Sequence, residues 1–100
     1  MDEKNIERVA AMERALNACT AATQALDAQL ARMDALREET IALFRYYGSE
    51  DWHRDREAAL PPDLPAGVLS EDAAYDAYTA LRNTAFHMLE LGTDILKNRI

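Results

Sequence analysis

The fold is decided by the N-terminal half of the chain, in which residues 9–44 read VAAMERALNACTAATQALDAQLARMDALREETIALF. Neither glycine nor proline occurs between Asp2 and Tyr47, and alanine, the strongest helix former, is abundant. Apolar residues recur here in two rows at seven-residue spacing, namely Met12, Cys19, Leu26 and Met33 in one row, and Val9, Leu16, Leu30 and Phe44 in the other. The rows hold eleven positions, of which Thr23, Arg37 and Thr40 are polar and the other eight are apolar. Such a heptad stripe is typical of a helix that packs against another helix.

This pattern predicts one long helix over residues 3–47. Asp2 is the expected N-cap, and Gly48 is expected to end the helix in the left-handed conformation. A helix of about 45 residues is about 67 Å long. A break near Thr20–Thr23 is the alternative to a continuous helix.

Two shorter helices are predicted after Gly48. Ser49 is the expected N-cap of a helix over residues 49–60, and Ser70 that of a helix over residues 70–97. Three prolines and a glycine make residues 61–67 an extended or turning connection.

The last helix carries two further signals. Ala85 and Gly92 are small enough to let another helix approach closely, and Lys97 and Arg99 suit the negative end of the helix dipole.

The fold class that follows is all-α, with residues 1–100 forming one domain of three helices. The third helix, about 28 residues long, is expected to pack antiparallel on the first. Because it is shorter than the first helix, part of the apolar stripe stays uncovered, and self-association through that part is expected.

Charge is concentrated in the middle of the chain. Net charge is −7, and residues 49–80, with two basic and eight acidic side chains, carry −6 of it. Direct nucleic-acid binding is not expected, because it needs basic surface. An acidic segment fits a basic protein partner, mimicry of a polyanion, or simple solvation.

Location follows from other features of the sequence. No apolar run reaches the length of a membrane span, the N-terminus lacks a signal-peptide core, and a single cysteine fits a reducing compartment. We therefore expect a cytoplasmic protein without membrane contact.

No residue pattern indicates catalysis, a metal site or a cofactor. His53 lies among carboxylates, but neighbouring positions of a helix point in different directions, which favours a solvated acidic face over a metal site. Cys19 occupies a stripe position and is predicted to be a buried structural thiol. Ser49 and Ser70 are explained as caps. We expect no enzyme.

Aromatic residues gather beside the acidic segment. Tyr46, Tyr47, Trp52, Tyr75 and Tyr78 are expected to form a hydrophobic cap over one end of the helices. Alternatively they are anchors of a binding surface. The candidate binding residues are Tyr46, Tyr47, Asp51, Trp52, Asp55, Glu71, Asp72 and Asp76.

Two segments of this region, YYGSEDWHRDRE (residues 46–57) and LPPDLPAGVLSEDAAYD (residues 60–76), resemble the bacterial family described as domain of unknown function 4298. That family combines a long N-terminal helix with a YYGSEEW-like element, a P-x-D-L segment and a GVLSEDA-Y-D helix start. Ala66 departs from it, standing where a basic residue often precedes the glycine. The resemblance implies a short helical protein of bacterial or prophage origin and brings no known activity.

Two hypotheses for function remain. The first is a non-enzymatic helical module that binds a protein partner or a second copy of itself. The second is an acidic, phage-encoded type of inhibitor that blocks a nucleic-acid-binding target by charge mimicry.

Overall fold

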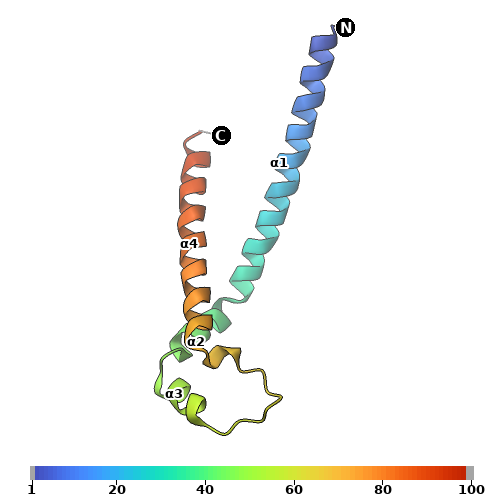
Figure 1. The fold of residues 1–100 in the computed structure, drawn as a ribbon. Coiled ribbons are helices and arrows are strands. Elements are labelled where there is room, and N and C mark those ends of the chain that lie inside the picture. The colour runs from blue at the N-terminus through green and yellow to red at the C-terminus, as the bar shows by residue number, and fades with distance from the viewer. Residues whose placement is uncertain (1, 99–100) are drawn as a thin grey trace. The chain divides into compact units, whose positions relative to one another are not determined.

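The computed structural model describes residues 2–98, and within them all regular structure is helical. Four α-helices are present: α1 (Glu3–Ala35), α2 (Arg37–Tyr46), α3 (Glu50–Glu57) and α4 (Glu71–Leu96), with the 3₁₀ helix η1 (Gly67–Leu69) before α4 (Figure 1). The all-α prediction is confirmed for this part of the chain. Arg99, predicted to lie at the helix end, falls outside the described residues. None of the helices between residues 2 and 98 combines the length and the apolarity that crossing a lipid bilayer requires.

The predicted continuous helix over residues 3–47 is wrong at one residue. Leu36 leaves helical geometry (φ −91°, ψ 2°) and separates α1 from α2, so residues 2–98 form four α-helices where three were predicted. The N–H of Leu36 still donates to the Arg32 carbonyl at 3.1 Å and to the Met33 carbonyl at 3.2 Å. Because most of the hydrogen-bonded ladder survives, this turn needs neither glycine nor proline.

The chain divides into two compact units, residues 1–38 and 39–100. Unit 1 is essentially α1, which Asp2 caps by accepting a hydrogen bond from the Lys4 N–H. No residue of α1 is buried. Cys19 is exposed, so the prediction of a buried thiol is wrong. A single helix has no second element against which its apolar stripe can be buried.

Unit 2 contains most of α2 and the whole of α3, η1 and α4. Its buried residues are Trp52 on α3 and Ala74 on α4. The rings of Phe44 on α2 and Tyr78 on α4 meet edge to face at 5.2 Å. Within this unit α3 and the loop after it lie at the N-terminal end of α4 (Figure 1).

In unit 2 the predicted N-caps of α3 and α4 are confirmed, whereas the predicted end of α3 is not. Ser49 caps α3 by accepting from the Trp52 N–H, and Ser70 caps α4 by accepting from two N–H groups. α3 ends at Glu57 and not near residue 60, since Ala58 is already extended (ψ 149°). The connection remains non-helical up to Gly67, where η1 begins.

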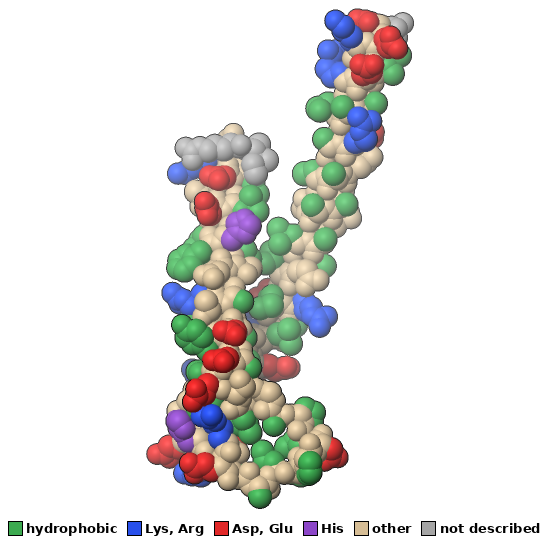
Figure 2. All heavy atoms as spheres, viewed as in Figure 1, with side chains coloured by type: hydrophobic (Ala, Val, Ile, Leu, Met, Phe, Trp, Pro, Cys, Tyr) green, Lys and Arg blue, Asp and Glu red, His purple; other side chains and the backbone are tan. Residues whose placement is uncertain are grey.

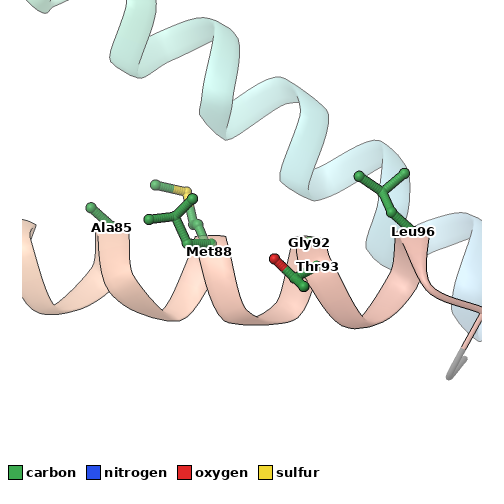
Figure 3. A pocket seen from close by; sticks show the side chains of 6 residues that line it. Ala85, Met88, Gly92, Thr93 and Leu96 are labelled. Atoms are coloured by element: carbon green, nitrogen blue, oxygen red, sulfur yellow. The ribbon is translucent and has the colours of Figure 1, made fainter.

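One face of α4 is apolar and carries small residues. A shallow hollow on it is lined by Ala85, Met88, Leu89, Gly92, Thr93 and Leu96 (Figure 3). A Cβ atom added at Gly92 would meet nothing within 4 Å. The space beside this glycine is open within unit 2, and the close approach of another helix stays a prediction.

Candidate functional site: an aromatic and acidic junction

The junction between α2 and α3 is set by one left-handed residue. Gly48 has φ +78°, a conformation that side chains disfavour, and it turns the chain directly after Tyr46 and Tyr47. The Ser49 N–H donates to the Tyr46 carbonyl at 2.9 Å, which closes the turn. The two tyrosines are thereby fixed beside the first turn of α3.

Trp52 is the anchor of the junction. Its side chain is 4% exposed, and its indole Nε1–H donates to the Val68 carbonyl of η1 at 3.0 Å. The Tyr47 ring lies edge to face against it at 5.0 Å, and the Arg56 guanidinium lies 4.6 Å from the ring centre. The indole thus holds α3, the end of α2 and η1 together.

The junction is fastened to the start of α4 by two polar contacts with Glu71. The Tyr47 hydroxyl donates to the Glu71 carbonyl at 2.7 Å. Arg56, already over the Trp52 ring, reaches the Glu71 carboxylate at 3.4 Å. The first turn of α4 is therefore bound to both α2 and α3.

Tyr46 and Asp55 form a second, separate pair. The Tyr46 hydroxyl donates to Asp55 Oδ2 at 2.5 Å. This hydrogen bond, together with desolvation and the negative charges of Asp55 and Asp51, raises the pKa of Tyr46 to about 12. The phenol therefore stays protonated at physiological pH and acts as a donor to the carboxylate.

An apolar hollow of about 260 Å³ opens beside this pair. It is lined by Tyr46, Asp55, Leu60, Leu64, Pro65, Ala66, Val68 and Leu69. The loop after α3 supplies one wall and η1 supplies another. Figure 2 shows this part of the surface hollowed and ringed by hydrophobic side chains.

The structure brings together five of the eight predicted site residues. Tyr46 and Asp55 form one pair, while Tyr47, Trp52 and Glu71 belong to the indole cluster. Asp51 lies apart, with its exposed carboxylate 3.4 Å from Arg54. Asp72 and Asp76 are exposed on α4.

The aromatic cap is confirmed only for part of the predicted set. Tyr46, Tyr47 and Trp52 form it with their polar atoms paired, and Tyr78 packs on Phe44. Tyr75 is 59% exposed and is not part of the cap.

Sequence reasoning missed Arg56, Val68 and the leucines of the hollow. Arg56 follows Trp52 by four positions, the spacing at which helix neighbours touch, and that spacing was the available signal. The position of Val68 gave no such signal, because its contact with Trp52 spans sixteen residues.

Other chemical candidates are dispersed. Between residues 2 and 98, no three His, Cys, Asp or Glu side chains gather closely enough to hold a metal ion. His53 places its ring edge to face on Trp52 at 4.9 Å. The histidine is therefore part of the aromatic cluster.

Comparison with known proteins gives one match. Neither the curated proteins nor the solved structures contain a match to the chain. The family described as domain of unknown function (DUF4298) matches residues 9–91, which include most of α1, the whole junction and most of α4. That match covers more than half of the sequence, and the chain belongs to the DUF4298 family.

Proposed function

We propose that the protein is a non-enzymatic interaction module whose α1 stripe binds a partner helix or a second copy of the chain. The observation that carries the proposal is that α1 has a heptad stripe and buries none of its residues. Val9 is 64% exposed and Leu16 is 59% exposed. Figure 2 shows the hydrophobic side chains spaced along this helix.

The size of the stripe supports a moderate, concentration-dependent association. Its large residues are Val9, Met12, Leu16, Leu26, Leu30 and Met33, each of them exposed. Burying what they expose would contribute on the order of 5–10 kcal/mol from each chain, or about 10–20 kcal/mol when two copies pair. Association costs about 4–15 kcal/mol in lost freedom. The two terms are of similar size, so dimers would form only as concentration rises.

The interruptions of the stripe also fit a packed interface. The Thr23 hydroxyl donates to the Cys19 carbonyl at 2.8 Å, so this polar group is satisfied without water. Arg37 binds Asp34 at 2.6 Å. A polar position in an otherwise apolar seam favours one alignment of the two helices over its neighbours.

Within one chain, α4 would compete for the stripe if it packed antiparallel on α1, as the sequence predicts. It carries its own exposed apolar residues, including Phe86 and Leu89. Antiparallel packing would cover part of the stripe, since α4 has 26 residues and α1 has 33. The remainder would still be open to a second chain.

Sedimentation equilibrium over a range of concentrations tests the proposal. We expect the average mass to rise with concentration for the native chain and to stay that of a monomer for Leu16→Glu with Leu30→Glu. The matched control, Ala21→Glu with Ala28→Glu, adds the same charge to the opposite face of α1 and should leave association unchanged. If the native chain remains monomeric and no helical partner binds the stripe, the proposal fails.

The acidic-inhibitor hypothesis is the second candidate, and one observation favours it. Both arginines of residues 49–80 already contact carboxylates, Arg54 with Glu50 and Asp51 and Arg56 with Glu71. Neither arginine of this segment is available to neutralise its other carboxylates. Neutralising exposed carboxylates that make no cap, with Asp51→Asn and Asp76→Asn, should weaken binding to a basic target and reduce its salt dependence. Unchanged affinity would refute mimicry.

A further inference from the structure

The hollow beside Tyr46 and Asp55 combines apolar walls with a carboxylate. Leu60, Leu64, Val68 and Leu69 give it apolar walls, and Asp55 places a carboxylate in the lining. Four successive parts of the chain contribute to it: the end of α2, the second half of α3, the loop after α3 and η1. Its shape therefore depends on the folded junction.

The carboxylate of Asp55 has a neutral partner and no cationic one. Tyr46 binds Oδ2, while no ion pair to Asp55 is present among the described residues. Arg54 and Arg56, the basic residues of α3, are directed to other carboxylates. A carboxylate against an apolar wall is stabilised by a hydrogen-bonded cation, and the structure leaves that position open.

The volume of the hollow restricts the occupant. At about 260 Å³ it is smaller than the roughly 300–1,000 Å³ of pockets for drug-sized ligands. One long side chain with an apolar stem and a charged head has the appropriate dimensions. The −6 charge of residues 49–80 attracts basic molecules to this part of the surface.

We propose that this hollow is a binding site for an arginine side chain presented by a basic protein partner. The aliphatic stem lies along the leucines, and the guanidinium meets the carboxylate of Asp55 and the oxygen of the Tyr46 hydroxyl. Because that hydroxyl donates its proton to Asp55, its lone pairs remain acceptors. Two adjacent acceptors match the planar fork of arginine better than the point charge of lysine. The site is independent of the α1 stripe, and either proposal stands if the other fails.

The test is an NMR titration of the full-length protein with N-acetyl-arginine N-methylamide. The indole N–H of Trp52 is a built-in reporter, because it donates to the carbonyl of Val68 in the wall of the hollow. We expect saturable shifts at Trp52, Val68 and Tyr46. The citrulline analogue has the same shape without the charge. Its affinity should be at least about tenfold lower, as expected for the loss of a charged hydrogen bond.

Variants locate the site. Asp55→Asn keeps an acceptor for Tyr46 and removes the charge, and it should lower arginine affinity about tenfold. Glu50→Gln removes the same charge from an exposed side chain of the same helix and should leave the affinity unchanged. Leu64→Ala, in a loop where Leu64 is already 49% exposed, should weaken binding without unfolding the protein. If Asp55→Asn fails to fold, Leu64→Ala still tests whether arginine binds in the hollow.

Three results would overturn the proposal. One is equal binding of the arginine and citrulline probes. Another is a set of shifts on the acidic face of α3 that Glu50→Gln removes and Leu64→Ala does not. The third is tighter binding of free arginine than of the blocked form, which would make the occupant an amino acid and not a protein side chain.

Discussion

Replacing Trp52 is the most direct test of how the junction is held together. With 4% exposure, the indole buries nearly all of the roughly 150–250 Å² that a large aromatic side chain offers, worth at most about 4–6 kcal/mol at 25 cal/mol per Å². Trp52→Ala should destabilise unit 2 by about 3–5 kcal/mol. Trp52→Phe keeps a ring and loses mainly the hydrogen bond to Val68, which is about 1–2 kcal/mol.

The loss of stability in Trp52→Ala should fall on unit 2. A small folded unit has a free energy of unfolding near the low end of about 5–15 kcal/mol, so Trp52→Ala would remove most of it. Hydrogen exchange should then be fast at the amides of His53, Leu69 and Ser70, which report on α3, η1 and the start of α4. Circular dichroism alone is a poor assay, because α1 supplies much of the helical signal and belongs to the other unit. Tryptophan fluorescence is lost, since Trp52 is the single tryptophan.

Phe86→Ala is the matched control for aromatic truncation. Phe86 is 60% exposed on α4, and its loss should change the free energy of unfolding by less than about 0.5 kcal/mol. If Trp52→Ala has an effect as small as that of the control, the indole does not hold the junction together, and both the anchor and the shape of the hollow beside it are wrong.

Three further predictions concern individual groups. The pKa of Tyr46 rises from 10.0 to about 12 in the folded chain. The hydrogen bond of its phenol therefore contributes fully to stability below pH 10, and this contribution is lost as the pH rises from 10 to about 12. Urea unfolding across that range should show the loss in the native chain and not in Tyr46→Phe. Gly92→Ala should stabilise α4 by about 1 kcal/mol in thermal unfolding, and a destabilisation would show that another helix packs against this glycine. Ser70→Ala should cost about 1 kcal/mol in the same assay, and Ser70→Asp, which can also cap, should not.

Helix starts were predictable from the sequence because their causes are local. Asp2, Ser49 and Ser70 each accept a hydrogen bond from an N–H two or three residues ahead, and Gly48 adopts the left-handed conformation by itself. These interactions lie within one turn of chain. The residue types therefore carry the information without knowledge of the rest of the fold.

The break at Leu36 and the hollow were not predictable for the opposite reason. Leu36 is a good helix former in a stretch without glycine or proline, and it lies in unit 1 close to the boundary with unit 2. The hollow depends on the contact of Trp52 with Val68, sixteen residues away, and on the course of a proline-rich loop. Periodicity describes a helix face and contains no information about such contacts.

The α1 stripe and the acidic segment lie in different parts of the chain, and that separation makes the two proposed surfaces distinguishable. The stripe of α1 lies in a segment whose net charge is small, while residues 49–80 carry most of the acidity. Hydrophobic association is strengthened by salts such as sulfate, whereas attraction between exposed charges is screened within about 10 Å at 0.1 M salt. Raising the sulfate concentration should therefore favour self-association through the stripe and weaken arginine binding at the hollow. If both responded in the same direction, the stripe and the hollow would not act as two independent surfaces.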